Sequence, residues 1–253
     1  MNVVWMPTLR CNLACSYCAA RQLPQAHAQP ELTPEAWIAL FQGSPRSIEQ
    51  VAITGGEPAL YPSMKQVVDA CDWNVCIDTN LRVDPRTWLP DDLNRMVAIN
   101  AGLHFDAAHT EARCYWDRLS WLREHLPVTS QIVCCYVVLW RDQPERVQEV
   151  EAQALARGVE FRPLTFDHSF LWKRPAPLQA GFRTCNGGSD FLVMMPDATA
   201  YRCIGHAYYD LQPLGQGADW PALDAWTPCH EVICTTCDQT MKSDLEPEPP
   251  CQP

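Results

Sequence analysis

Short apolar runs alternate with helix-forming segments over residues 2–165. The apolar runs predict six strands, at residues 3–8, 50–54, 74–79, 97–105, 128–139 and 159–165. Between them, Thr33-Pro34-Glu35 carries the N-cap and first-turn proline of a helix, and the charged amphipathic segment 143–157 ends at Gly158. This alternation predicts an α/β fold with a parallel sheet covered by helices, and ligands at the carboxyl ends of the strands.

The alternation stops after about residue 167, where prolines, a pair of glycines and clustered cysteines replace it. Residues 191–195 and 199–203 flank Pro196-Asp197 and predict a β-hairpin. The stretch 243–253 is acidic and rich in proline, which predicts disorder. We therefore expect a core at residues 1–167, a small cluster-binding domain at 168–242 and a disordered tail at 243–253.

The first predicted strand leads into Cys11, Cys15 and Cys18, which have the spacing C-x3-C-x2-C. Three thiolates from one loop can hold three corners of a cubane iron–sulfur cluster and leave the fourth iron open for chemistry. The second predicted strand leads into a Gly-Gly-Glu-Pro segment at residues 55–58. The two motifs, in this order, resemble those of the radical S-adenosylmethionine (SAM) superfamily, whose core is a partial (β/α)6 TIM-like barrel.

The resemblance implies that the three cysteines hold a [4Fe–4S] cluster whose open iron binds SAM. In that family, the Gly-Gly-Glu-Pro motif contacts the methionyl amine of SAM, and the end of the third strand lies near the ribose. An aromatic residue before the third cysteine often contacts the adenine. The matching residues of this chain are Tyr17, Gly55, Gly56, Glu57, Pro58, Asp78, Thr79 and Asn80.

A second set of cysteines lies beyond residue 180. Two pairs of thiolates suit either a [4Fe–4S] cluster or a structural zinc ion. The pattern resembles the Twitch domain, a shortened SPASM domain that carries one auxiliary [4Fe–4S] cluster, and sets that include Cys229 or Cys251 stay open. The expected ligands are Cys185, Cys203, Cys234 and Cys237.

Composition narrows the classes of function. Fourteen cysteines in a chain with neither a signal peptide nor a long apolar span predict a cytoplasmic protein in which thiols bind metal rather than form disulfides. A net charge of −11 and the lack of a Lys/Arg cluster argue against binding to nucleic acid or to an anionic membrane. The cysteines without ligand spacing, which include Cys134 and Cys135, are predicted to pack as small apolar residues.

Polar residues recur on one face of three predicted strands. Because alternate residues of a barrel strand point inward, Asp78 with Asn80, His104 with Asp106, and Arg162 with its neighbour Glu160 are predicted to face the interior. We expect His104, Asp106 and Arg162 to serve in catalysis, with His104 or Asp106 as a base. Two alternatives stay open, namely a buried hydrogen-bonded His104 and an Arg162 that only pairs with Glu160.

The resemblance implies a radical SAM oxidoreductase. Reductive cleavage of SAM yields a 5′-deoxyadenosyl radical that removes hydrogen from a C–H bond, and the auxiliary cluster then accepts an electron. An electron donor such as flavodoxin or ferredoxin is implied as a partner. Peptide-modifying relatives often carry an N-terminal recognition domain, and the first predicted strand, at residues 3–8, leads us to expect none here. This favours a polar small-molecule substrate (a sugar, an aminocyclitol or a similar natural-product precursor) over a ribosomally made peptide. A non-catalytic iron–sulfur or zinc protein is the contrasting class.

Overall fold

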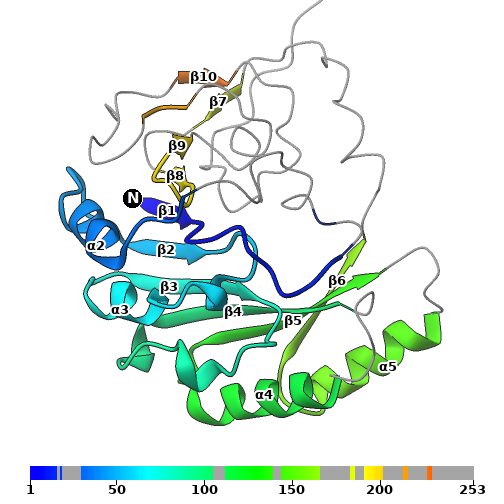
Figure 1. Cartoon of the computed structure of the whole chain (residues 1–253). Coiled ribbons are helices and arrows are strands. Elements are labelled where there is room, and N and C mark those ends of the chain that lie inside the picture. Colours follow the sequence, from blue (N-terminus) through cyan, green and yellow to red (C-terminus); the bar gives the residue numbers. More distant parts are fainter. Residues whose placement is uncertain are drawn as a thin grey trace, which may run out of the picture.

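The computed structural model describes residues 1–15, 18, 30–104, 112–138, 144–165, 183–185, 191–201, 213–215 and 227–229. Its centre is an eight-stranded sheet with the order β6-β5-β4-β3-β2-β1-β8-β9 (Figure 1). The strands are β1 (Asn2–Trp5), β2 (Gln50–Ile53), β3 (Asn74–Thr79), β4 (Met96–Leu103), β5 (Gln131–Val138), β6 (Glu160–Thr165), β8 (Phe191–Met194) and β9 (Ala200–Tyr201). All neighbours from β6 to β8 are parallel, and β9 is antiparallel to β8. The predicted α/β class with a mostly parallel sheet is confirmed.

The helices cover the outer side of the sheet (Figure 1). They are α2 (Pro34–Gln42), α3 (Met64–Asp69), α4 (Ala112–His125) and α5 (Pro144–Leu155), with short 3-10 turns at Pro58–Leu60, Pro85–Thr87 and Leu93–Arg95. At the start of α2, the Thr33 hydroxyl accepts a hydrogen bond from the Ala36 N–H, as the sequence predicts. Beyond α5, Gly158 has φ +67°, a conformation that glycine adopts at little cost.

The main core lies between the helices and the sheet. Trp5 of β1 makes edge-to-face contacts with Trp37, Phe41 and Trp73, with ring centroids 5.4, 5.5 and 6.5 Å away. Burial of these rings stabilises the folded state by roughly several kcal/mol, and it fixes which face of β1 packs against the helices. The alternate residues of β1 and of the loop that follows it, such as Val4 and Met6, therefore point toward the inner side of the sheet.

Five of the six predicted strands differ from the observed ones at an end, and in two of them one end is wrong by three residues. The first ends at Trp5 rather than at residue 8, although the chain continues alongside the loop that follows β2. The fifth begins at Gln131 rather than at residue 128, because a turn closed by the Ser130 N–H and the Pro127 carbonyl precedes it. Apolar residues in these turns extended the apparent runs.

The predicted hairpin is present as β8 and β9, with Ala198 at φ 61° in its turn. Its partner was not predicted: β8 pairs in parallel with β1, so the hairpin extends the main sheet. Phe191 and Val193 join Val4 and Met6 in an apolar cluster on the inner face. The predicted boundary at residue 167 lies outside the described residues, as does the tail at 243–253, and both stay predictions.

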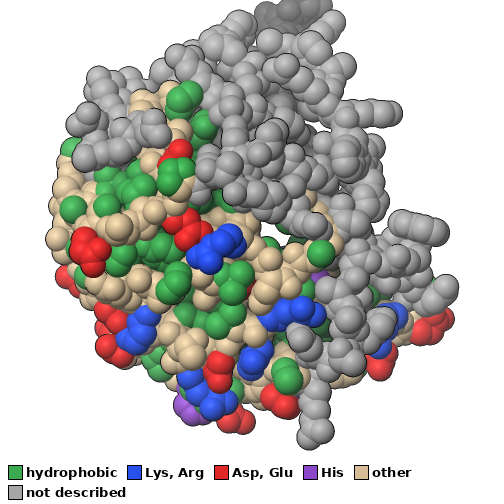
Figure 2. All heavy atoms as spheres, viewed as in Figure 1, with side chains coloured by type: hydrophobic (Ala, Val, Ile, Leu, Met, Phe, Trp, Pro, Cys, Tyr) green, Lys and Arg blue, Asp and Glu red, His purple; other side chains and the backbone are tan. Residues whose placement is uncertain are grey.

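A second, two-stranded antiparallel sheet joins β7 (Arg183–Cys185) to β10 (Thr227–Cys229). None of the helices in the described ranges is both long and apolar enough to span a bilayer. On the face drawn in Figure 2, acidic and basic side chains are interspersed over the described surface.

Candidate active site

A cavity of about 500 Å³ opens at the carboxyl ends of the parallel strands. The cysteine loop and the loop after β2 form one side of it, and inward residues of β3 to β6 form the other. Ligands of open α/β sheets bind at this edge. Its wall includes Cys11, Leu13, Cys15, Cys18, Thr54, Gly55, Gly56, Glu57, Asp78, Thr79, Asn80, Asn100, Gly102, His104, Cys135, Val137, Arg162 and Leu164.

The three motif cysteines share this cavity. Cys15 is buried in an apolar cluster with Leu13 and Val137, against which Cys11 and Cys18 also pack. The Leu13 N–H lies 3.4 Å from the Cys11 sulfur, and the Cys18 N–H donates to the Cys15 carbonyl. The loop thus presents three thiols to one space, with an apolar wall behind them.

The loop after β2 runs alongside the chain that leads into the cysteines. Gly56 N–H donates to the Thr8 carbonyl at 3.0 Å, and Glu57 N–H donates to the Arg10 carbonyl at 2.8 Å. A Cβ atom on Gly56 would lie 2.1 Å from the Arg10 carbonyl oxygen, and Gly55 has φ +118°. Both glycines are therefore required by this close backbone approach, whatever ligand the loop contacts.

Glu57 is almost fully buried, at 1% exposure. Its carboxylate accepts hydrogen bonds from the Thr79 hydroxyl at 2.8 Å, the Asn80 N–H at 2.7 Å and the Ala59 N–H at 3.2 Å. Burial raises the pKa of Glu57, and these three donors oppose that rise. The side chain joins the loop after β2 to the end of β3. Pro58, also buried, begins the short turn that follows.

Asp78 and Asn100 form a polar pair on neighbouring strands. The Asn100 amide donates to the Asp78 carboxylate at 2.8 Å, and the Thr54 hydroxyl also bonds to it. The Asp78 side chain is exposed to the cavity, but the protein around it still removes much of its hydration, and this desolvation raises its pKa. Its face is the one predicted from strand parity.

His104 folds back over Gly102, and a Cβ at Gly102 would lie 2.5 Å from its Nε2. Burial, followed by the positive charge of Arg82, lowers the pKa of His104 to about 4. Arg162 also lines the cavity, with its guanidinium 3.0 Å from the Glu160 carboxylate. Both alternatives raised by the sequence therefore have geometric support, since His104 is half-buried and Arg162 is paired. Asp106 and Tyr17 lie outside the described residues.

Sequence reasoning missed three polar groups among the described residues that line the cavity, Thr54, Asn100 and Cys135. Asn100 has the same parity as His104 on β4, so the pattern contained its signal. For Cys135, the sequence predicts a packing role. Burial raises its pKa to about 12, so the thiol is neutral.

The predicted auxiliary ligands are mostly outside the described part of the chain, which lacks Cys203, Cys234 and Cys237. Cys185 ends β7, whose partner strand β10 ends at Cys229. In this register Cys185 pairs with Thr227, and Cys229 pairs with Arg183.

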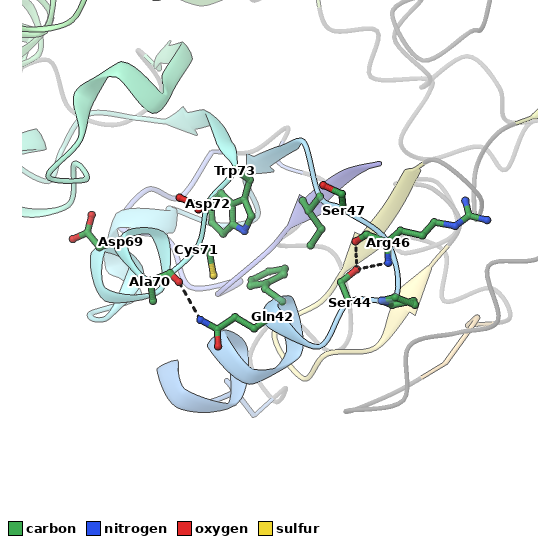
Figure 3. Close-up of a pocket in the computed structure, with 12 residues that line it drawn as sticks. Gln42, Ser44, Arg46, Ser47, Asp69, Ala70, Cys71, Asp72 and Trp73 are labelled. Atoms are coloured by element: carbon green, nitrogen blue, oxygen red, sulfur yellow. Dashed lines mark hydrogen bonds between the residues drawn. The ribbon is translucent and has the colours of Figure 1, made fainter.

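A second cavity, of about 520 Å³, lies at the opposite, amino end of the sheet (Figure 3). It is formed around the ends of α2 and α3, where the Gln42 amide donates to the Ala70 carbonyl at 3.1 Å. Cys71 is its one thiol among the described lining residues, and burial raises the pKa of that thiol. The candidate active site is the first cavity, because both sequence motifs lie there.

The thiols of the first cavity suit a cluster better than a single ion. Within the described ranges, no three Cys, His, Asp or Glu side chains converge as ligands of one metal ion. A cubane does not require such convergence, because each thiolate binds a different iron. Three thiols on one loop, beside a roomy cavity with an apolar wall, fit a [4Fe–4S] cluster with one open iron.

The sequence model of the Radical SAM superfamily matches residues 5–134, just over half of the chain. The chain belongs to the radical SAM superfamily. Membership implies a [4Fe–4S] cluster and SAM as cofactors. No curated protein sequence matches the chain significantly.

Two solved structures share the radical SAM fold of this chain. One is native anSMEcpe with bound AdoMet and the Cp18Cys peptide, at 13% sequence identity and a TM-score of 0.50, covering 88% of this chain and 79% of that one. The other is native anSMEcpe with bound AdoMet, at 12% identity, with the same TM-score and coverage.

Proposed function

We propose that this radical SAM enzyme oxidises a C–H-bearing position of a polar small molecule, such as a sugar or an aminocyclitol. One observation carries the proposal. The cysteine loop and the loop after β2 face, across one cavity, a wall that contains Asp78, Asn100 and Arg162. The first side suits the cluster and SAM, and the second offers hydrogen bonds to a polar substrate.

The cluster and SAM, when bound, supply the agent that removes a hydrogen atom from the substrate. The remaining work falls to the chain. Asp78 and Asn100 can accept and donate hydrogen bonds to substrate hydroxyl or amino groups. The resemblance assigns Asp78 to SAM, and the sequence predicts His104 or Asp106 as the base. In the cavity, however, the Asp78 carboxylate is exposed beside Asn100, and burial by the surrounding protein raises its pKa, which makes it a stronger base than an ordinary aspartate. We therefore assign proton removal to the Asp78 carboxylate.

Net oxidation also requires an acceptor for one electron. We propose that an auxiliary [4Fe–4S] cluster held by Cys185, Cys203, Cys234 and Cys237 accepts it. Bound there, the cluster would take the electron, while the substrate would give a hydrogen atom to the SAM-derived fragment and a proton to Asp78. Cysteine spacing supports the ligand set, and the position of Cys229 on β10 makes Cys229 the alternative to test.

A second candidate is a redox-neutral reaction, and the neutral thiol of Cys135 in the cavity wall favours it. In this case the thiol returns a hydrogen atom to the substrate radical. The sulfur radical left behind then takes up one electron from an external one-electron reductant and one proton from water.

The decisive experiment uses iron-reconstituted protein with SAM, a one-electron reductant and a panel of aminocyclitols and amino sugars, prepared in D₂O. We expect about eight irons per chain, release of 5′-deoxyadenosine, and a product two hydrogens lighter. The variant Cys11→Ala/Cys15→Ala/Cys18→Ala should keep about half the iron and release no 5′-deoxyadenosine.

Other results separate the candidates. Product of unchanged mass except for one deuterium, lost in Cys135→Ala, would favour the redox-neutral reaction. If the enzyme turns over members of a peptide panel and none of the small molecules, the small-molecule proposal is wrong and the substrate is a peptide. Full substrate oxidation by the Cys234→Ala/Cys237→Ala protein would reject the auxiliary cluster as the electron acceptor.

A further inference from the structure

The side chain of Asn80 reaches from the end of β3 to the cysteine loop. Its Nδ2 lies 2.8 Å from the Asn12 Oδ1 and 3.8 Å from the Cys11 sulfur. The second distance is within hydrogen-bond range for the large sulfur atom. An amide nitrogen carries two hydrogens, so Asn80 can donate to both partners at once.

The orientation of this amide is fixed by its surroundings. Asn80 Oδ1 accepts a hydrogen bond from the Arg82 N–H at 2.9 Å, which leaves Nδ2 as the atom facing Cys11. Its backbone N–H donates to the Glu57 carboxylate at 2.7 Å. The next residue, Leu81, has φ 55° and a carbonyl that accepts from Arg118, so the turn is held in a conformation that non-glycine residues rarely adopt.

The family resemblance places this residue near the SAM ribose, whereas the geometry points to the cluster. We propose that Asn80 is a positioning residue that donates a hydrogen bond to the Cys11 thiolate and thereby raises the reduction potential of the cluster. The proposal rests on Cys11 being a cluster ligand. Reduction adds negative charge to the cluster, and a donor to a ligand sulfur stabilises that charge.

The neighbourhood of Cys11 makes this donor important. Apolar Leu13, Cys15 and Val137 cluster beside it, and the Glu57 carboxylate adds negative charge nearby. Low polarity and a nearby anion both oppose reduction. Among the described groups, the Cys11 sulfur has one other hydrogen-bond donor besides Asn80, the Leu13 N–H at 3.4 Å. Loss of the Asn80 amide would leave that one weak contact.

The test is an EPR-monitored redox titration of the reconstituted protein without SAM or substrate. Asn80→Ala should lower the ratio of reduced to oxidised cluster about tenfold at a fixed potential, which is 59 mV for a one-electron couple. Asn80→Asp keeps the acceptor for Arg82 but puts a carboxylate beside Cys11, and should lower the ratio further. Asn94→Ala is the matched control, because it removes the same kind of amide, which bonds to Asp92 and lies away from the cavity.

A spectroscopic readout supplements the potential. In D₂O, the deuterium coupling of one exchangeable hydrogen to the reduced cluster should be present in wild type and in Asn94→Ala, and lost in Asn80→Ala. If Asn80→Ala protein does not retain the cluster, Asn80→Ser, which keeps a small donor, should show an intermediate shift.

If cluster-containing wild-type, Asn80→Asp and Asn80→Ser proteins have equal potentials and equal couplings, the proposal for Asn80 is wrong while the proposed function stands. Wild-type protein that takes up no [4Fe–4S] cluster would overturn it together with the proposed function. The two failures are therefore distinguishable.

Discussion

The contact between the loop after β2 and the cysteine loop can be tested with one methyl group. In Gly56→Ala, the new Cβ would lie 2.1 Å from the Arg10 carbonyl oxygen and 2.6 Å from two backbone carbons. These are main-chain atoms, so no side-chain rotation can relieve the clash. The two loops must separate, which breaks or lengthens the bonds from Gly56 N–H to Thr8 and from Glu57 N–H to Arg10.

The expected loss of stability follows from these contacts. Overpacking costs about 1–3 kcal/mol, and each weakened backbone hydrogen bond adds about 0.5–1.5 kcal/mol. We expect Gly56→Ala to lower the free energy of unfolding by about 3 kcal/mol, measured by urea denaturation of the metal-free protein under reducing conditions. Separation of the loops should also lower the iron content after reconstitution.

Gly158→Ala is the matched control, because it adds the same methyl group away from the cavity. There the Cβ meets, among the described residues, only the Arg123 Cγ, at 4.0 Å, and the cost is the strain of φ +67°, about 1 kcal/mol. Its iron content should equal that of wild type. A Gly56→Ala protein no less stable than Gly158→Ala, with full iron content, would refute the close approach of the two loops.

Two further predictions concern the buried groups of the cavity. His104 has a folded-state pKa of about 4, so the unfolded chain binds a proton first as the pH falls; the stability from neutral His104 is complete above pH 6.5 and lost toward pH 4. Between pH 7 and pH 5, the free energy of unfolding measured by urea denaturation should therefore fall by about 2 kcal/mol less in His104→Gln than in wild type. The same pH dependence in both proteins would contradict a lowered pKa of His104. Glu57→Gln should lower the free energy of unfolding by about 1–3 kcal/mol at pH 7. The NH₂ group of the new glutamine would replace a carboxylate oxygen that accepts a hydrogen bond from an N–H or hydroxyl group. The exposed Glu49→Gln should change little, and equal losses in the two variants would show that the Glu57 contacts contribute nothing.

The sequence was sufficient to locate β1 to β6 of the main sheet, though not all of their ends, because each is a short apolar run bounded by turn or helix signals. It was not sufficient for the partner of β8. The run from Phe191 to Met195 is buried throughout, so its composition shows a central strand but carries no signal for pairing with β1, which lies nearly 190 residues earlier. Such pairing depends on the shape of the inner core, to which both strands contribute.

Strand parity located part of the cavity wall and failed on β5. Asp78, His104 and Arg162 could be assigned to the interior because polar and apolar residues alternate on their strands. On β5, residues 132–136 are all buried, since helices cover one face and the cavity wall forms the other. Alternation is lost in such a strand, and Cys135 therefore could not be distinguished from Cys134.

The two motifs of the radical SAM family lie some forty residues apart, yet the structure joins them through one chain of contacts. Glu57 accepts from the Asn80 N–H, and the Asn80 amide reaches Cys11 and Asn12. Beneath this chain, the glycine backbone of the second motif is bonded to the strand extension that carries the first. A change at Glu57 should therefore affect the cysteine loop as well as the loop assigned to SAM. Separating a direct contact with SAM from this indirect route requires the cluster potential and the SAM affinity of the same variant. A Glu57→Gln protein that loses SAM affinity while its potential stays unchanged contacts SAM directly, and one in which both change acts through Asn80.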